Sequence, residues 1–275
     1  MCCSQALLIH NRCVDNRPPR AAVDSGAALW IAPRLSGQFG AVSRTVPAGF
    51  AAYARIFHPA GPGAAVHRRW SEVAAVNGRI MHPLAQYARI STPAPGRTEP
   101  APLAGIQAPA TGDLEPACLR SVCEILARHT PAPAQCWFAV WEGWGDLRGS
   151  GHVASFGLGG LRPQVRRAPA AWQLDLRAPK FALPHRVYYL FTGPVGDAVK
   201  IGTWVNRDWF LPRSPNIFWP GGRSWCIASE IDFDSTIVGG TTDLIADVLH
   251  CDDLEAWPVA PDDSLAWDGD TINQP

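Results

Sequence analysis

The side chains best placed for chemistry are three carboxylates, Glu230, Asp232 and Asp234, at alternate positions of one short stretch. The stretch predicts a strand over 225–233, because apolar side chains recur there at nearly every second position. Alternate side chains of a strand point to the same face, so the carboxylates would project together. Ile231 is then expected on the opposite, core-facing side.

This row of carboxylates has several interpretations. Its oxygens could bind a hard cation such as Mg²⁺ or Ca²⁺, or a buried pair could act as general acid and base. A solvated strand face balanced by arginines is the structural alternative, and Arg186 and Arg223 are the basic residues expected beside it. No Lys or Arg follows Arg223, whereas 12 Asp and Glu do. The balancing charge must therefore come from earlier in the chain, from a cation or from water.

The usual catalytic signatures are missing from the sequence. It contains no HxH, HExxH or HxxxH pair, no GxSxG and no phosphate-binding glycine loop. His58, His82 and His129 each stand beside Pro or Thr-Pro at the end of an expected element, where an imidazole commonly caps a carbonyl. Cys226 would share the carboxylate face, and nearby negative charge blunts a thiol nucleophile. We therefore assign no catalytic residue, no metal ligand and no cofactor.

Tryptophan provides a signal for binding, since the chain has 12 Trp against 4 Tyr. Most should be core residues, but Trp144 and Trp219 lie in turns bounded by Gly or Pro, where core packing is less expected. Exposed tryptophans are favoured contact residues for partner proteins and ligands. The predicted binding surface consists of Trp144, Trp219, Arg223, Glu230, Asp232 and Asp234.

Hydrophobic periodicity predicts the elements that must position this surface. The clearest are strands at Ala52–Phe57 and Cys136–Trp141, a helix at Asp113–Arg128, and a helix that Thr241 or Thr242 caps after a break at Gly239-Gly240. The less regular ones are a helix capped by Ser71 and stopped by Gly78, and strands at Trp172–Leu176 and Arg186–Phe191.

These elements do not alternate steadily, which favours an α+β fold: a single domain with a mixed or antiparallel sheet and a few short helices. We expect this domain to span residues 41–255, with a Pro-rich loop at 91–112. Residues 1–40 are expected to be a poorly ordered N-terminal extension, and residues 256–275 a loosely held acidic tail.

Composition excludes several classes of protein. The chain has 275 residues, 47% of them apolar and 17% charged, with a net charge of zero, which is typical of a soluble globular protein. It lacks the concentrated basic surface that nucleic-acid binding needs and the run of about 20 apolar residues that a membrane span needs. Its eight cysteines form no CxxC. We expect free thiols, a reducing cytoplasm, and neither nucleic acid nor membrane as a partner.

Three stretches resemble an uncharacterised protein family that is associated with GC-rich, actinobacterial-type genomes. They are VPAGFAAYARIFHPA (Val46–Ala60), CWFAVWEGWG (Cys136–Gly145) and SPNIFWPGGRSWCIASEIDFDSTIVGG (Ser214–Gly240). The resemblance covers about residues 46–259. The family has no assigned activity, so the resemblance implies no mechanism and no site residues. Gly221-Gly222 departs from the acidic residue or alanine expected after Trp219-Pro220, which makes that turn looser.

Two functional hypotheses follow. The first is a cytoplasmic binding or interaction module, with a protein as the candidate partner. The alternative is a small metal-assisted hydrolase or transferase that uses Glu230, Asp232 and Asp234. A histidine or second carboxylate cluster within about 4–6 Å of Asp232 in a concave site would favour the enzyme. A flat, exposed face would disfavour it.

Overall fold

One large antiparallel sheet runs through the part of the chain that the computed structural model describes, which comprises residues 16–61, 67–96, 106–130, 135–148 and 168–274. Its strands are β1 (Arg20–Ala21), β2 (Ala52–Phe57), β3 (Cys136–Trp141), β4 (Lys180–Leu183), β5 (Arg186–Gly193), β8 (Ile217–Pro220), β9 (Cys226–Ala228), β10 (Ser235–Gly240) and β11 (Ala256–Val259). A separate hairpin pairs β6 (Gly202–Trp204) with β7 (Phe210–Pro212).

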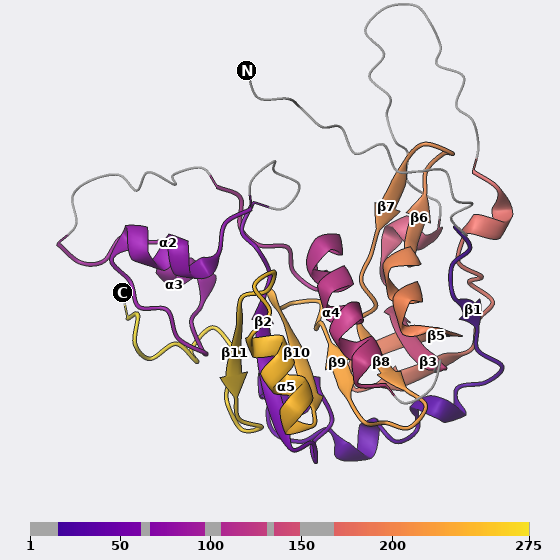
Figure 1. Cartoon of the computed structure of the whole chain (residues 1–275), viewed down its shortest axis with the longest axis horizontal. Helices are drawn as coiled ribbons and strands as arrows, with labels where there is room; N and C mark the ends of the chain where they lie inside the picture. Colours follow the sequence, from indigo (N-terminus) through magenta and orange to yellow (C-terminus); the bar gives the residue numbers. More distant parts are fainter. Residues whose placement is uncertain (1–15, 62–66, 97–105, 131–134, 149–167, 275) are drawn as a thin grey trace, which may run out of the picture.

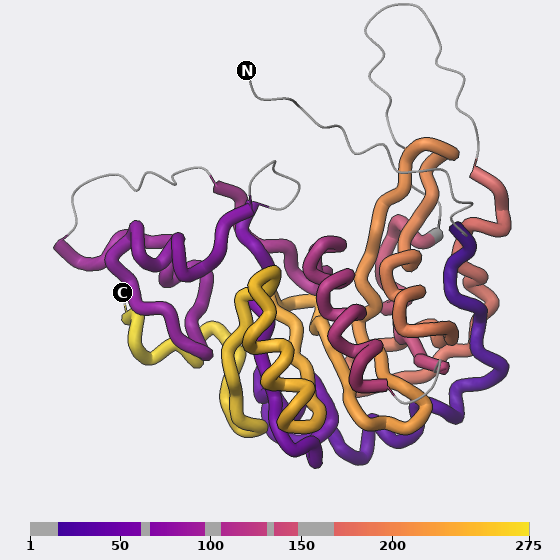
Figure 2. The backbone as a smooth tube through the Cα atoms, viewed as in Figure 1, coloured from indigo at the N-terminus to yellow at the C-terminus, as the bar shows by residue number. Residues whose placement is uncertain are grey.

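The strand order in the large sheet is β1-β5-β3-β8-β9-β10-β2-β11, with β4 also paired to β5. Every pairing among the described strands is antiparallel. β1 and β2 stand near opposite ends of this order, so the segment 22–51 between them spans the width of the sheet (Figure 2). The predicted α+β class is confirmed, with an antiparallel sheet.

Helices and 3₁₀ turns cover the sheet. The helices are α1 (Val42–Thr45), α2 (Trp70–Asn77), α3 (Tyr87–Ile90), α4 (Pro116–Arg128) and α5 (Thr242–Leu249). The 3₁₀ turns are η1 (Gly26–Ala28), η2 (Ala32–Arg34), η3 (Gly145–Arg148), η4 (Ala170–Trp172) and η5 (Val195–Lys200). α4 and α5 lie beside each other on one face (Figure 1). The main core between this face and the helices contains Phe138, Ile227 and Val238.

A second core covers the opposite face of the sheet. Ala139, Cys226 and Ile237, which alternate with residues of the first core, pack there against Trp30 and Ile31 of the N-terminal segment. Strands whose side chains are buried on both faces read as continuous apolar runs, which is why CWFAVW is nearly all apolar.

A third, smaller core lies beyond the β2–β11 end of the sheet, where α2 and α3 pack (Figure 1). Its centre is Trp70, whose ring contacts Phe57 at 4.6 Å and Tyr87 at 5.3 Å between centroids. The Trp70 indole nitrogen donates to the His58 carbonyl. This core ties the helices to the end of β2.

The strongest patterns are confirmed. β2 and β3 have their predicted bounds, and α4 and α5 form where amphipathic periodicity predicts them. Gly78 ends α2 with a φ of 66°, and the Thr241 hydroxyl caps α5 by accepting from the Leu244 amide. The predicted cap at Ser71 is wrong: α2 begins at Trp70 with Arg69 at the N-cap, and the Glu255 carboxylate accepts hydrogen bonds from the amides of Trp70 and Ser71.

Three predictions about elements are wrong. Trp172–Leu176 is not a strand, and the break expected at Gly239-Gly240 lies within β10. The strand expected over 225–233 ends at Ala228, and residues 230–234 form the connection to β10. Ile231 lies in this connection and is only half-buried.

The two ends of the described chain are better ordered than expected. Residues 1–15 lie outside the described residues, but β1 pairs with β5, and Trp30 and Ile31 are buried. Towards the C-terminus, β11 joins the sheet, and Asp270 and Asn273 are buried. Both segments therefore form part of the folded unit, in contrast to the expected extension and tail.

Candidate functional site

The three carboxylates of the predicted row are divided between two arginines. Glu230 and Asp232 both accept hydrogen bonds from one nitrogen of Arg186, with Nη2 3.0 Å from Glu230 Oε1 and 2.7 Å from Asp232 Oδ2. Asp234 pairs with Arg55 instead, at 3.6 Å. The predicted common face does not exist, because the connection turns between the strands. The predicted neighbour Arg186 is confirmed, whereas Arg223 lies over the ring of Trp30.

Arg55 is a buried cation with a structural role. Only 1% of it is exposed, and it donates to the Ser235 hydroxyl and to the carbonyls of Pro83 and Ala85. Burial lowers the pKa of Arg55 to about 10, and Asp234 partly offsets this. Burial raises the pKa of Asp234, which Arg55 offsets in turn. This pair joins β2 to β10 and to the segment before α3.

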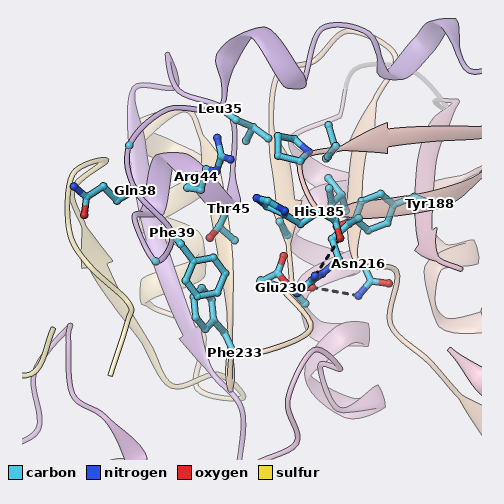
Figure 3. A pocket seen from close by; sticks show the side chains of 18 residues that line it. Leu35, Gln38, Phe39, Arg44, Thr45, His185, Tyr188, Asn216, Glu230 and Phe233 are labelled. Atoms are coloured by element: carbon cyan, nitrogen blue, oxygen red, sulfur yellow. Dashed lines mark hydrogen bonds and ion pairs between the residues drawn. The ribbon is translucent and has the colours of Figure 1, made fainter. Parts of the chain in front are cut away.

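A cleft opens beside Glu230 and Arg186, with a volume of about 600 Å³ (Figure 3). We call it the Glu230 cleft. It lies between the segment 35–45, the β4–β5 turn and the ends of β8 and β9. Its lining residues are Leu35, Gly37, Gln38, Phe39, Gly40, Arg44, Thr45, Leu183, Pro184, His185, Arg186, Tyr188, Asn216, Ile217, Ala228, Ser229, Glu230 and Phe233.

Two arginines in this lining have donors that the described residues do not use. The guanidinium of Arg44, on α1, has no hydrogen bond or ion pair within the described part of the chain. The Nε of Arg186 is buried and likewise finds no acceptor there. Buried polar groups are normally satisfied, so an orphaned donor at a cleft calls for an explanation.

Glu230 and Tyr188 add two titratable groups to the cleft. Burial raises the pKa of Glu230, and the charge and hydrogen bond of Arg186 oppose the rise. Burial also raises the pKa of the Tyr188 phenol, with a further contribution from Glu230. Figure 3 shows Glu230 and Asn216 at the base of the cleft, with Arg44 and His185 higher on its two sides.

His185 occupies an unusual backbone position at the rim. Pro184 and His185 form the two-residue turn between β4 and β5, and the φ of His185 is 70°. Proline followed by a residue with positive φ is the pattern of a type II turn, in which glycine usually fills the second position. Histidine there carries strain, and such outliers cluster at functional sites.

The two predicted tryptophans do not form a surface at this site. Trp219 lies in β8, is 1% exposed and packs edge-on against Trp30. Trp144 is half-buried, its indole nitrogen donates to Asn216, and Arg213 lies 4.1 Å from the centre of its ring. Arg223, in the turn between β8 and β9, is exposed and lines no part of the cleft.

Ser229 also lines the cleft, but its hydroxyl turns to the other side of the sheet. The Ser229 oxygen lies 2.7 Å from the Thr236 hydroxyl, which lies 2.8 Å from Nε2 of His58. Thr236 points to the same face as Val238, in the main core, whereas Ala228 in the cleft belongs to the opposite core. The hydroxyl chain is therefore internal and supplies no nucleophile to the cleft.

The three histidines singled out in the sequence are bound by the protein. His58 caps the Ala110 carbonyl, as predicted, with Nδ1 at 2.6 Å. His82 and His129 contact carboxylates instead, with Nε2 of each 2.8 Å from an oxygen of Asp270 and of Asp247 respectively. None of the three lines the Glu230 cleft.

The residues of the cleft that the sequence analysis missed come from separate elements. Arg44, His185 and Asn216 lie far apart in sequence and belong to no shared motif. Two local signals could have directed attention to this region: the Pro184-His185 turn and the glycines around Phe39. Neither reveals that the two segments meet.

Comparison with known proteins gives no match for this chain, whether among protein-family models, curated proteins or solved structures. The resemblance to the actinobacterial-type family therefore stays a prediction. In the described part of the chain, no helix is both long and apolar enough to cross a membrane. The described residues also contain no group of three or more His, Cys, Asp or Glu side chains placed to hold a metal ion.

Proposed function

We propose that this protein is a binding module, and that the Glu230 cleft takes a small organic anion with an apolar body. The observation that carries the proposal is Arg44, a cation that lines the cleft and has no partner within the described residues. Unpaired arginines are well suited to carboxylates and phosphates, because the planar guanidinium donates to two oxygens at once.

The composition of the cleft supports this ligand. About 600 Å³ falls within the range of pockets for small molecules, which are mostly apolar with a few placed polar groups. Leu35, Leu183, Ile217 and Phe39 provide apolar surface. Arg186 already pairs with Glu230 and Asp232, so Arg44 is the cation of this lining that the described residues leave unpaired, and its charge favours an anion.

Glu230 acts as a positioning residue in this proposal. It holds one nitrogen of Arg186 at 3.0 Å, which fixes the guanidinium, while the buried Nε has no acceptor among the residues that the structure describes. The anionic group of the ligand would lie between this guanidinium and Arg44, while the apolar body contacts Phe39 and Leu183. His185, at the rim, offers a further hydrogen-bonding group.

Titration with anilinonaphthalenesulfonate, an apolar anion, tests the proposal by fluorescence on the folded protein. Arg44→Gln should raise Kd about tenfold, which corresponds to about 1.4 kcal/mol for the loss of a charge-assisted contact. Arg34→Gln is the matched control, because Arg34 is exposed on η2 and lines no part of the cleft. An unchanged Kd in Arg44→Gln, or equal binding of the uncharged anilinonaphthalene, would contradict the proposal.

The proposal extends to location and partner. A cytoplasmic location fits the thiols of Cys118, Cys123, Cys136 and Cys226, which are free and buried. Burial raises the pKa of the first three to about 12, so these thiols are inert rather than reactive. We expect no nucleic acid as a partner, because the chain lacks a concentrated basic surface.

The alternative, a metal-assisted hydrolase or transferase, has a separate test. An ion bound by Glu230 and Asp232 would have to displace Arg186 from both carboxylates, which it now bridges. Thermal melts with and without Mg²⁺, Ca²⁺ or Mn²⁺ measure this directly, since a ligand that binds only the folded state raises Tm. A raised midpoint would support the metal-dependent enzyme, and an unchanged one would rule it out.

A further inference from the structure

A second hollow adjoins the Glu230 cleft, with a volume of about 660 Å³. We call it the acidic groove. Its lining residues are Gly37, Gln38, Phe39, Ala41, Gln86, Asp232, Phe233, Asp234, Asp262, Ser264, Leu265, Ala266, Trp267 and Asp268. Phe39 and Phe233 pack together at 5.5 Å between ring centroids (Figure 3). Both residues line the two hollows, so this aromatic pair is the wall between them.

The charge of the acidic groove is the opposite of that of the cleft. Its described lining contains four aspartates and no Lys, Arg or His. Asp232 and Asp234 are already paired with Arg186 and Arg55. Asp262 and Asp268 are exposed, and neither side chain has a hydrogen bond or ion pair within the described residues. Two full negative charges are thus available to a partner.

Two exposed aromatic side chains accompany these charges. Trp267 is 78% exposed and Phe39 is 63% exposed, which places both among the large apolar side chains that the protein leaves in water. Large exposed aromatics that line a groove are typical of interaction sites, where they become buried contact residues.

Trp267 is held by a fixed backbone. Leu265, two residues earlier, is buried and its amide donates to the Gly40 carbonyl at 2.7 Å. Asp270, three residues later, is fully buried and accepts from His82 at 2.8 Å. The amide of Gly269 closes the turn on the Ala266 carbonyl. A fixed backbone reduces the entropy that this segment loses on binding, which favours affinity.

We propose that the acidic groove docks an extended, arginine-bearing segment of a partner protein. A guanidinium can stack on the face of an exposed tryptophan while its edge donates to carboxylates, and Trp267 lies next to Asp268 in this groove. Charge complementarity selects arginine over acidic or neutral segments. Arg89 donates to the backbone carbonyl of Trp267, and among the described residues it forms no ion pair with Asp262 or Asp268.

The proposal is independent of the anion that the Glu230 cleft takes. The groove and the cleft share only their aromatic wall and the loop around it, and their charges differ in sign. Either site can therefore fail its test without deciding the other, provided that the variants avoid the shared residues. Asp262, Trp267 and Asp268 line the groove alone.

The test is fluorescence anisotropy with a short fluorescein-labelled peptide of alternating arginine and serine, titrated with the full chain. Asp262→Asn with Asp268→Asn should raise Kd about tenfold, and Trp267→Ala should do the same. Asp208→Asn with Asp252→Asn is the matched control: both residues are exposed aspartates outside the groove. A peptide of alternating glutamate and serine should not bind.

Three results would overturn the proposal. The first is wild-type protein that binds the arginine peptide no better than the glutamate peptide. The second is a control pair that weakens binding as much as the groove pair, which would indicate general charge attraction. The third is an unchanged Kd in Trp267→Ala. Thermal melts of each variant accompany the titration. Tm is expected to stay at the wild-type value, because the substituted side chains are exposed and those of Asp262 and Asp268 have no partner in the described part of the chain.

Discussion

Arg186 and Arg55 balance the charge of the three carboxylates Glu230, Asp232 and Asp234. No basic residue follows Arg223, so these carboxylates need charge from elsewhere in the chain. Arg55 supplies it from β2, and Arg186 from the start of β5. Because removal of one member of a buried pair leaves an unpaired charge, Arg55 is required by the fold, whereas Arg186 lines the cleft and belongs to the site.

His58 gives the sharpest prediction for a single residue. Burial lowers the pKa of His58 to about 4, well below its usual value of 6.5. The unfolded chain therefore binds a proton at a pH where the folded protein does not. Stability from His58 is complete above pH 6.5 and is lost as the pH falls towards 4, and the loss should reach about 3 kcal/mol.

Urea unfolding across this pH range, on wild type and on His58→Gln, measures the effect. Glutamine can still donate to the Ala110 carbonyl and accept from Thr236, but it does not titrate. We expect a flatter dependence on pH in His58→Gln than in wild type. His250→Gln, which removes an exposed histidine, is the control. Parallel pH profiles for wild type and His58→Gln would show that His58 is not the group responsible.

At the scale of elements, the connection between β9 and β10 determines where the site residues lie. It sets Glu230 in the cleft, Asp232 at the groove and Asp234 against Arg55. The segment before α4 packs against this connection, and the Gly112 amide donates to the Phe233 carbonyl at 2.8 Å. The contact is so close that only glycine fits.

Gly112→Ala should therefore destabilise the protein by more than about 3 kcal/mol. The φ of Gly112 is +68°, and an added Cβ would lie 2.5 Å from the Ile231 Cα. Gly49→Ala is the matched control, since its φ is +101° but nothing lies within 4 Å of the added atom. The control should lose only about 1–2 kcal/mol, from backbone strain. If urea unfolding shows that Gly112→Ala and Gly49→Ala lose the same free energy of unfolding, the 230–234 connection can move to accommodate the added Cβ.

The sequence predicts an element well where its hydrophobic pattern reflects core packing alone. β2, β3, α4 and α5 follow from apolar runs or amphipathic periodicity, and packing confirms them. The connection after β9 misled the prediction because Ile231 and Phe233 continue the alternation of the strand by coincidence, although both are only half-buried. Alternation shows which residues could share a face, but it does not show where a strand ends.

The candidate site was only partly predictable. Glu230, Asp232 and Arg186 were identified from charge alone, and they do lie together. Arg44 and Asn216 could not be identified from the sequence, because no local pattern predicts that α1 and the residue before β8 line the same cleft. Trp219 was misplaced for a related reason: its partner Trp30 comes from the N-terminal segment, which we had expected to be poorly ordered.

For the whole molecule, the two ends of the described chain connect layers that pack on different parts of the sheet. The N-terminal segment crosses one face from β1 to β2 (Figure 2). Residues 264–274 then join this segment to the α2–α3 layer, since Leu265 bonds Gly40 while Asn273 bonds Ile80 in both directions. We call residues 264–274 the C-terminal clasp, and Asp270 is its fully buried centre.

Asp270 should therefore contribute to the stability of the whole fold and not only of its own segment. Burial alone would raise the pKa of Asp270, but hydrogen bonds from Asn273, His82 and Gln86 lower it to about 2. Its contribution to stability is present above pH 3.8 and is lost as the pH falls towards 2. Asp270→Ala should cost about 3 kcal/mol at neutral pH, because it leaves several buried donors without an acceptor.

Hydrogen exchange distinguishes a global clasp from a local contact in this variant. Asp270→Ala should lose protection at the amides of Ile80 and Leu265, which belong to different layers, and much less at β3 and β5 in the centre of the sheet. Asp268→Ala is the matched control, an exposed aspartate two residues away whose side chain has no partner among the described residues. If Asp270→Ala loses protection only at residues 270–274, the C-terminal segment does not hold the layers together, and the groove beside Trp267 loses its rigid support.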